Sequence, residues 1–316
     1  MAAKKKRPRR DRRTLAILSR KRSLYSTRRL VEAAKARDVR ARVYDTLELT
    51  LVLETDSPQL FYRGAPVEDV GCVIPRIGAS ITAYGLAVVN QFDMMGVPVV
   101  NNSVPIARSR DKLRCLQLLS RFGIPIPRTV MAREKIDLDK AIARIGGLPA
   151  IIKLIQGTQG VGVMIAHSMA EIATILETMQ GIGQQVLLQE FVAESKGRDV
   201  RALVVGDRVV GAMRRVAREG EFRSNIHRGG EGEPLPELPP GYAEVAVKAA
   251  QVIGLEVAGV DLLESDAGPK VMEVNSSPGF EGLEQATGAD VAGAIVEHAM
   301  VFAEAVRSGF QKPRVI

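Results

Sequence analysis

Three oxygen-bearing side chains, Asp261, Glu273 and Asn275, lie in two apolar segments that flank the turn-forming run Ser265–Gly268. Segments of this kind around a short turn predict a β-hairpin. With the turn centred near Ala267, Asp261 lies opposite Glu273, and Asn275 follows on the same face. Facing carboxylates repel each other unless a cation lies between them, and Asp, Glu and Asn supply the hard oxygen ligands that Mg²⁺ prefers. The hairpin therefore predicts a metal site.

The same register gives the hairpin an apolar second face, with Val260 and Leu262 opposite Met272 and Val274. We expect this face to point toward the core. The alternative is a hairpin edge whose acids face water, because a register slip of one residue would reverse the two faces.

A glycine-rich run, Gly157-Thr-Gln-Gly160-Val-Gly162, follows Lys153 between two apolar segments. Glycines let backbone N–H groups approach phosphate oxygens, and a nearby lysine neutralises their charge. The run fits a phosphate-binding loop, and it fits a glycine-rich hairpin turn equally well. It is not a P-loop, because no Gly-Lys-Ser/Thr sequence ends it.

A nearly all-apolar segment, Val186–Val192, ends in the acid Glu190 followed by Phe191. A carboxylate at such a strand end can accept a hydrogen bond from an adenine amino group, while the neighbouring backbone completes the base edge. In isolation, a strand-end acid in water is the more common explanation.

Basic side chains gather within fifteen residues, on a predicted strand and the loop after it: Arg214, Arg215, Arg218, Arg223, His227 and Arg228. A planar guanidinium binds carboxylate or phosphate with two hydrogen bonds, so the cluster predicts an anion site. A solvated basic face is the alternative. The order of metal hairpin, glycine loop, strand-end acid and arginine cluster in one chain favours a nucleotide site.

The elements that must position these residues follow from the alternation of apolar runs and turn residues. Strand–helix–strand alternation over residues 15–101 predicts a small parallel sheet, with residues 47–70 irregular and a strand at 97–101. A single helix is expected over 109–122, and antiparallel strands and helices from 128 onward. We therefore expect α/β and α+β parts in one chain.

Five segments are predicted along the chain. They are a disordered basic tail (1–13), an N-terminal α/β domain (14–108), a central subdomain with the glycine loop (109–192), a C-terminal subdomain with the metal site (193–310) and a short tail (311–316).

The basic charge of the chain belongs mostly to its N-terminal tail. The 316 residues include 44 basic and 36 acidic ones, a net charge of +8, and residues 1–13 hold eight basic residues and one acid. The remainder is nearly neutral, which argues against a broad nucleic-acid surface. The tail itself can contact RNA, the ribosome or an acidic partner, chiefly through residues 4–13, or serve only as a solubilising extension.

Cys72 and Cys115 lie far apart in apolar segments, so we expect reduced, buried thiols in a cytoplasmic protein. No window of the sequence approaches the roughly 20 apolar residues that span a bilayer, and no secretory signal is evident. We therefore expect no membrane contact.

Six motifs in the chain resemble the ATP-grasp superfamily and, within it, the RimK family of glutamate ligases. They are Leu15-Ala-Ile-Leu-Ser-Arg20, Val73-Ile-Pro-Arg-Ile-Gly78, Ala107-Arg-Ser-Arg-Asp-Lys112, Lys153-Leu-Ile-Gln-Gly-Thr-Gln-Gly-Val-Gly162, Glu221-Phe-Arg-Ser-Asn-Ile-His-Arg-Gly-Gly230 and Val271-Met-Glu-Val-Asn-Ser-Ser-Pro-Gly279. The resemblance implies an ATP-grasp fold with an N-terminal parallel-sheet domain, a small central lid domain and a C-terminal mixed-sheet domain.

The resemblance also implies roles for individual residues. ATP would be bound by Lys112, Lys153, Gly157, Gly160, Gly162, Glu190, Phe191, Asp199, Arg223, Ser224 and Asn225. Two metal ions, either Mg²⁺ or Mn²⁺, would be held by Asp261, Glu273 and Asn275. Catalytic roles fall to Arg215, Arg223 and Asn225, and substrate contacts to Arg76, Arg214, Arg215, His227 and Arg228. We expect Arg214, Arg215 or both to bind a glutamate carboxylate.

The implied reaction is ATP-dependent amide formation through an acyl phosphate. The partners would be free glutamate and a small-subunit ribosomal protein with a glutamate-rich C-terminus, and we expect a homo-oligomer. Two alternatives are a ligase for another acceptor or for free polyglutamate, and an RNA- or ribosome-binding regulator that acts through the basic tail.

Overall fold

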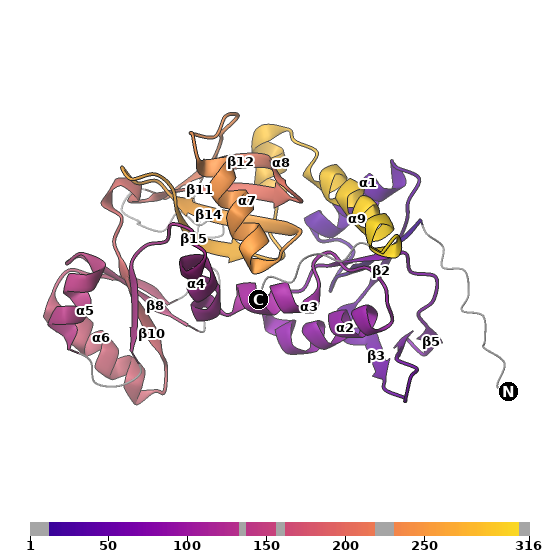
Figure 1. Ribbon diagram of the computed structural model, residues 1–316, viewed down its shortest axis with the longest axis horizontal. Coiled ribbons are helices and arrows are strands. Elements are labelled where there is room, and N and C mark those ends of the chain that lie inside the picture. The colour runs from indigo at the N-terminus through magenta and orange to yellow at the C-terminus, as the bar shows by residue number, and fades with distance from the viewer. Residues whose placement is uncertain (1–12, 133–136, 156–161, 219–230, 310–316) are drawn as a thin grey trace.

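The computed structural model describes residues 13–132, 137–155, 162–218 and 231–309. In this part of the chain four β-sheets are surrounded by helices, and the first and last helices lie side by side (Figure 1). Three short 3₁₀-helices span Thr46–Glu48, Ala79–Ile81 and Ala193–Ser195.

The N-terminal sheet is parallel, as predicted. Strand β1 (Thr14–Leu18) lies between β2 (Arg40–Tyr44) and β6 (Cys72–Pro75). Helix α1 (Tyr25–Lys35) connects β1 to β2, and α2 (Thr82–Met94) follows β6. Because β2 and β6 flank β1 on opposite sides, the carboxyl ends of β1 and β6 form a topological switch point.

Two sequence-based expectations for this domain are wrong. Residues 47–70 are not irregular but form an antiparallel sheet of β3 (Leu49–Val52), β4 (Gln59–Tyr62) and β5 (Ala65–Pro66), because Leu49 and Leu60 are buried against α2. The expected strand at 97–101 is a single bridge between Val73 and Val99.

The helix expected over 109–122 is instead two helices, α3 (Ser103–Arg110) and α4 (Lys112–Arg121). The break falls at Asp111, whose backbone is extended and whose side chain accepts a hydrogen bond from the Arg114 N–H at 3.0 Å. Asp111 therefore caps α4, and Lys112 begins that helix.

The central sheet has four antiparallel strands in the order β7 (Thr129–Ala132), β10 (Val186–Glu190), β8 (Ala150–Leu154) and β9 (Val163–Ala166). Helices α5 (Leu138–Ile145) and α6 (Met169–Gly181) pack on one face, where Ile142 and Leu176 meet Ile152. Lys153 follows Ile152 on the strand and therefore lies on the other face.

The C-terminal sheet is wholly antiparallel rather than mixed as expected. Its order is β13 (Glu231–Pro234), β12 (Arg208–Val216), β11 (Arg198–Val205), β14 (Val257–Leu263) and β15 (Lys270–Asn275). Two of its four antiparallel pairs, β11–β12 and β14–β15, are tight hairpins. Helix α7 (Tyr242–Ile253) and α4 cover one face.

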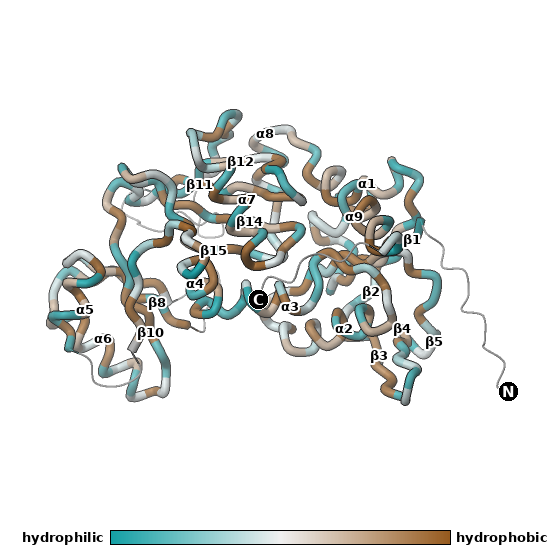
Figure 2. The backbone as a smooth tube through the Cα atoms, viewed as in Figure 1, coloured by the Kyte–Doolittle hydropathy of each residue, from teal (hydrophilic) through white to brown (hydrophobic). Residues whose placement is uncertain are grey.

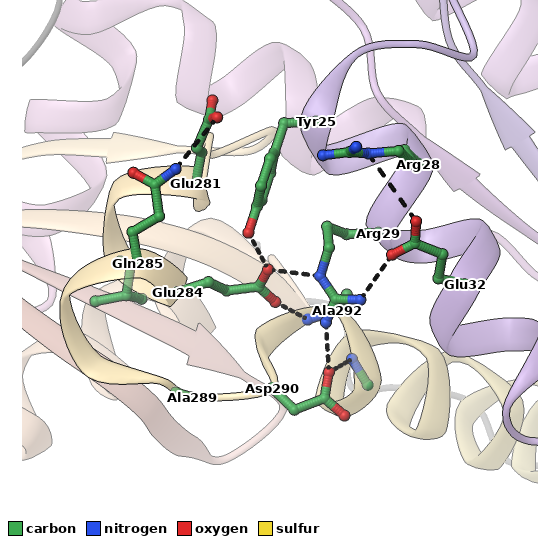
Figure 3. Close-up of polar contacts among 12 residues, drawn as sticks. Tyr25, Arg28, Arg29, Glu32, Glu281, Glu284, Gln285, Ala289, Asp290 and Ala292 are labelled. Carbon is green, nitrogen blue, oxygen red and sulfur yellow. Dashed lines mark hydrogen bonds and ion pairs between the residues drawn. The ribbon is translucent and has the colours of Figure 1, made fainter.

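The other face of this sheet joins the N-terminal domain. Helices α8 (Glu281–Thr287) and α9 (Val291–Arg307) pack there with α1. Glu284 of α8 is buried and accepts hydrogen bonds from the Tyr25 hydroxyl at 2.7 Å, Arg29 Nε at 2.8 Å and the Ala292 N–H at 3.0 Å (Figure 3). One carboxylate thus ties α1 to both C-terminal helices.

Apolar residues follow the packed strands, while hydrophilic residues follow the outer loops (Figure 2). Across the described segments, no helix is both long and apolar enough to traverse a lipid bilayer. Cys72 and Cys115 are buried in different apolar clusters, and burial raises the pKa of each thiol to about 12.

Candidate functional site

The β14–β15 hairpin has the register predicted at its polar positions. Asp261 lies directly opposite Glu273, and Asn275 lies opposite Gly259. A Cβ at Gly259 would lie 2.7 Å from Pro278 Cβ, so glycine is needed where the chain after Asn275 folds back. The confirmed register places all three oxygen-bearing side chains on one face of the hairpin.

One apolar position of the hairpin was predicted wrongly. A β-bulge follows Asp261, so that Leu262 pairs with Val271 rather than with Met272. Val271 is buried, whereas Met272 is only half-buried. The bulge adds one residue on β15, which restores the apolar face to the core while it keeps the acids together.

Asp261 is buried and held by two arginines. Arg201 donates to both of its oxygens at 2.7 Å, and Arg215 NH2 lies 3.0 Å from Oδ2. Burial alone would raise the pKa of Asp261, but the two guanidinium groups outweigh it and lower that pKa. The carboxylate therefore stays charged in the interior.

Glu273 behaves in the opposite way. Its pKa is raised, first because surrounding protein atoms displace water and second because the Asp261 carboxylate repels a second negative charge. Its side chain nevertheless keeps an exposed portion, so it can reach a ligand in solvent. The pair consists of one fixed carboxylate and one whose ionisation a cation would favour.

The hairpin residues fit a hard divalent cation. Asn275 has a buried side-chain atom, Nδ2, that makes no hydrogen bond, so its amide is not consumed by the internal structure. Two carboxylates and an amide oxygen form a donor set typical of Mg²⁺. Within the described ranges no group of three His, Cys, Asp or Glu side chains could hold a metal, so this site depends on Asn275.

Two lysines face this hairpin from other elements. Lys112 begins α4 and donates to the Leu154 carbonyl at 2.9 Å, and Lys153 lies on β8. Burial lowers the pKa of Lys153 to about 8, while the Glu273 carboxylate acts in the opposite direction on both lysines. The chain therefore gathers two half-buried cationic side chains opposite the acids, as a phosphate group requires.

Glu190, the predicted adenine contact, lies at the junction of the central and C-terminal sheets. Its Oε1 is 2.7 Å from Lys270 Nζ and 3.3 Å from Arg128 NH2, and its Oε2 accepts from the Arg128 N–H at 2.9 Å. Burial raises its pKa, but these hydrogen bonds outweigh burial and bring the pKa to about 2. Phe191 follows as a half-buried residue.

Asp199 and Arg215 form a buried pair, with Nε–Oδ1 and NH2–Oδ2 distances of 2.6 and 2.8 Å. Arg214, the next residue along β12, instead pairs with Glu264 at 2.7 Å on the α7 side of the sheet. Adjacent strand residues point to opposite faces, so Arg214 and Arg215 cannot bind one glutamate carboxylate together. Arg215 lies on the face of Asp261, and Arg214 does not.

Several predicted site residues lie outside the described residues: Gly157, Gly160, Arg223, Ser224, Asn225, His227 and Arg228. Of the glycine loop the structure describes Gly162, with a φ of +79°. A Cβ there would lie 2.6 Å from the Leu154 side chain, so the end of the loop requires glycine.

Two site residues were missed by the sequence analysis. Arg201 binds Asp261, and Lys270 binds Glu190, each at 2.7 Å. The signal for Arg201 was its position two residues after Asp199 on an antiparallel strand, which places both side chains on one face. Arg76, a predicted substrate contact, lies at the end of β6 beside Pro278.

A groove of about 1010 Å³ lies elsewhere in the described residues, between β12 and α7, and includes Val209, Leu238 and Val247. It contains neither the paired acids nor the lysines. The chemistry of the side chains therefore locates the site at the hairpin rather than in this groove.

Comparison with known sequences agrees with the resemblance drawn from the motifs. Residues 14–106 match the RimK PreATP-grasp domain, and residues 109–299 match the RimK-like ATP-grasp domain. A protein of Rhodopirellula baltica named "Probable alpha-L-glutamate ligase" is 56% identical over 90% of this chain and 70% of its own length. A protein of Chromohalobacter salexigens with the same name is 49% identical over 95% of this chain and 99% of its own.

Solved structures share the fold. The RimK domain protein ATP-grasp from Sphaerobacter thermophilus has a TM-score of 0.68 and 25% identity, covering 90% of this chain and 99% of its own. The ATP-grasp ligase PsnB, in complex with a minimal precursor, has a TM-score of 0.72 and 23% identity over 92% of this chain and 99% of its own. This second likeness concerns the fold alone.

Proposed function

The chain belongs to the RimK family of ATP-grasp proteins and is an ATP-dependent ligase, and we propose that it joins L-glutamate to the C-terminal carboxylate of a protein. We propose a small-subunit ribosomal protein with a glutamate-rich C-terminus as the acceptor. The names of the relatives support glutamate as the amine donor. The observation that carries the proposal is the Asp261–Glu273 pair facing two half-buried lysines, which suits the transfer of a phosphoryl group.

The reaction has two steps. The acceptor carboxylate oxygen attacks the γ-phosphorus of ATP, so that the bond to ADP breaks and an acyl phosphate forms. The amino group of glutamate then attacks the acyl carbon, an amide bond forms, and phosphate leaves as the amine loses its proton. No protein nucleophile is required, and the chain contributes positioning and charge neutralisation.

Metal ions would be held by Asp261, Glu273 and Asn275, in keeping with their donor atoms. Mg²⁺ or Mn²⁺ bound there, as one or two ions, would neutralise the negative charge of the phosphate oxygens. Arg201 and Arg215 fix the Asp261 carboxylate at the site. These two arginines therefore act as positioning residues in this proposal.

The nucleotide would lie between the central and C-terminal sheets. Lys112 and Lys153 would bind its phosphates, and Glu190 would accept a hydrogen bond from the adenine amino group. Glu190 can do so without losing its partners, because Oε2 accepts one hydrogen bond here and a carboxylate oxygen can accept two. The ribose contact from Asp199 and the roles of Phe191, the glycine loop and the 223–228 segment stay predictions.

The test measures ADP release and acceptor mass together. The purified chain is incubated with Mg²⁺, ATP and L-glutamate, with and without the ribosomal protein, and the intact acceptor is then weighed by mass spectrometry. Stepwise gain of glutamyl residues supports the proposal. ADP release without any change in acceptor mass would contradict the ribosomal acceptor and indicate another acceptor or free polyglutamate. No ADP release with any acceptor would contradict ligase activity.

A further inference from the structure

Arg76 lies where a parallel sheet usually binds a ligand. It follows β6, its N–H donates to the Leu18 carbonyl at the end of β1, and both strands end at the switch point. Pro278, whose carbonyl accepts from Arg76 NH2 at 2.7 Å, is three residues beyond Asn275. Three residues of chain span at most roughly 10 Å, so Arg76 lies close to the metal hairpin.

The Arg76 guanidinium is charged, but its partners are neutral and leave one of its N–H groups without a hydrogen bond. Its NH2 also contacts Ser26 Oγ at 3.2 Å, its guanidinium lies 5.7 Å from the Phe280 ring centroid, and its Nε is buried with no hydrogen bond. In the described part of the chain, no carboxylate forms an ion pair with it. Burial lowers its pKa to about 10, with no acidic group to oppose the shift.

Several buried polar atoms near the hairpin have no hydrogen-bond partner. Five buried side-chain polar atoms among the described residues make no hydrogen bond, and three of them belong to Arg76, Asn275 and Ser277. Buried polar atoms without partners are rare in folded proteins, so their concentration along this stretch indicates that it binds something other than the chain itself. Asn275 belongs to the metal hairpin, and the Arg76 guanidinium and the Ser277 hydroxyl beside it are donors that suit an anion.

The nearby β1–α1 loop also favours an anion. Residues 19–24 contain Arg20, which pairs with Asp45 at 2.9 Å, and the exposed Lys21 and Arg22, which have no acid beside them in the loop. The loop leads into α1, whose first turn has no acidic residue and no side-chain cap. Ser26 in that first turn contacts Arg76 directly. The loop and the helix start therefore add positive potential beside Arg76.

We propose that Arg76, with Ser26 and the basic loop 19–24, binds the side-chain carboxylate of the acceptor's penultimate residue. The reacting α-carboxylate of the acceptor then lies at the metal hairpin. Two residues of extended peptide span roughly 7 Å, which is below the upper bound of roughly 10 Å that the chain sets between Asn275 and Pro278, the residue that Arg76 contacts. This inference rests on the proposed function, since it names the feature of the acceptor that the ligase recognises.

The placement has a consequence for successive additions. Addition of glutamate to a C-terminal acid yields a product whose penultimate residue is again acidic. A subsite for that carboxylate favours acceptors that already end in two acids, so later additions are faster than the first addition to a neutral-penultimate acceptor. Arg76 would thus determine which acceptors bind tightly, and it would leave the binding of ATP and free glutamate unchanged.

The experiment uses two synthetic peptides that differ at one position, one ending in Glu-Glu and one in Gln-Glu. Wild type, Arg76→Ala and Arg76→Gln are compared for the peptide KM. Arg40→Ala is the matched control, because it removes an exposed positive charge from the same sheet, at the amino end of β2. Arg76→Gln keeps a donor toward Ser26 and Pro278 while it removes the charge, which guards against loss of folding.

For wild type we expect a KM about 10- to 100-fold lower for the Glu-Glu peptide, the size of one charge-assisted hydrogen bond. Both Arg76 variants should raise the KM of this peptide by the same factor and leave the KM values of the Gln-Glu peptide, ATP and glutamate nearly unchanged.

Equal KM values for both peptides with wild type would overturn the inference while the ligase function stands. A fall in kcat for both peptides alike would assign Arg76 to holding the 276–280 loop instead. Absence of glutamylation of either peptide by wild type would overturn the peptide acceptor and this inference together.

Discussion

Asp261 shows how a buried carboxylate is kept charged in this protein. Its two oxygens take three contacts from Arg201 and Arg215, and Arg215 is itself held by Asp199. The four residues have balanced charges and saturate one another's hydrogen bonds, which offsets the cost of their burial. Glu273, directly opposite, has no such partner in the described residues, so of the two facing carboxylates it is the one whose charge can change.

Glu273 should therefore be required for turnover. We expect Glu273→Gln to lower ADP release at least about 100-fold, because it removes one of the two carboxylates that would hold the metal ion. The neutral amide also relieves the repulsion from Asp261, so the free energy of unfolding should stay the same or increase. Steady-state ADP release and urea unfolding measure the two effects.

The control for this variant is Glu244→Gln, an exposed acid on α7 at the opposite face of the same sheet. It should retain wild-type activity. A Glu273→Gln enzyme with normal turnover would remove Glu273 from the metal site.

Glu190 gives a pH dependence of stability whose sign follows from its lowered pKa. Its folded pKa is about 2, below the value of roughly 4.3 for an unfolded chain. The ionised side chain therefore contributes stability that is fully present above pH 4.3 and is lost as the pH falls toward 2. We expect Glu190→Gln to cost about 1–2 kcal/mol at pH 7, after allowance for solvent screening.

Urea unfolding of wild type and Glu190→Gln at several pH values between 7 and 3 tests this expectation. The difference between the two proteins should shrink as the pH decreases. A difference that stays constant or increases toward pH 3 would show that the ion pairs with Lys270 and Arg128 do not lower this pKa.

At the scale of single residues, the sequence predicted contacts between residues that lie close together in the chain. The Asp261–Glu273 pairing followed from the position of one turn, because residues of a hairpin are close in sequence. Arg201 and Lys270 were missed because each meets its partner across strands or sheets that are 60 or more residues apart. The Arg214–Arg215 pair looked like one site until strand alternation placed the two side chains on opposite faces.

Among the elements, α1, α8 and α9 depend on one another. Glu284 is the shared partner, and Arg29 continues from it to Asp290 at 3.1 Å (Figure 3). Its carboxylate is almost fully buried, so its removal leaves the Tyr25 hydroxyl, the Arg29 guanidinium and a backbone N–H without their acceptor. This junction joins the first and last parts of the described chain.

We expect Glu284→Ala to reduce the free energy of unfolding by about 2–4 kcal/mol, because the Tyr25 hydroxyl and the Ala292 N–H lose their acceptor and Arg29 keeps only Glu32 and Asp290. Glu281→Ala, one turn earlier on α8, should change it by less than about 0.5 kcal/mol, because Glu281 is exposed and accepts only one hydrogen bond, at 3.5 Å, from Gln285. Urea denaturation of both variants is the measurement. Equal stability of the two variants would show that α1 does not need this carboxylate.

The elements themselves were predictable where turn residues and apolar periodicity agree. β1, α1, β2 and the β14–β15 hairpin carry such patterns. The β3–β5 sheet does not, since its strands are short, the β3–β4 turn has Asp56 rather than glycine at positive φ, and the β4–β5 turn has Arg63 at positive φ before Gly64. The α3–α4 break was missed because Asp111 ends one helix while it caps the next, without proline or glycine to mark the position.

At the scale of the whole molecule, charge is distributed unevenly between the tail and the body. Residues 1–12 carry seven basic residues and one acid, so a chain that lacks them has a net charge of +2 instead of +8. The proposed nucleotide and metal sites lie on elements between Lys112 and Asn275, and the proposed acceptor subsite at Arg76, Ser26 and residues 19–24 lies outside residues 1–12 as well. Activity and tail charge are therefore separable, and this separation tests whether the chain acts as a ligase or as an RNA-binding regulator.

We expect deletion of residues 1–12 to leave ADP release with glutamate and peptide acceptor within about twofold of the full chain. The deletion ends at residue 12 because the Arg13 carbonyl accepts a hydrogen bond from the Arg40 N–H at 2.8 Å and helps to start β2. Any RNA binding by the full chain should weaken steeply with salt and disappear in the shortened chain, because counterion release scales with the number of basic contacts. Electrophoretic mobility shift with a model RNA at two salt concentrations, beside the activity assay, measures both properties. If the shortened chain binds RNA as tightly as the full chain, the nearly neutral body carries a nucleic-acid surface, and if it loses ligase activity, the tail belongs to the site.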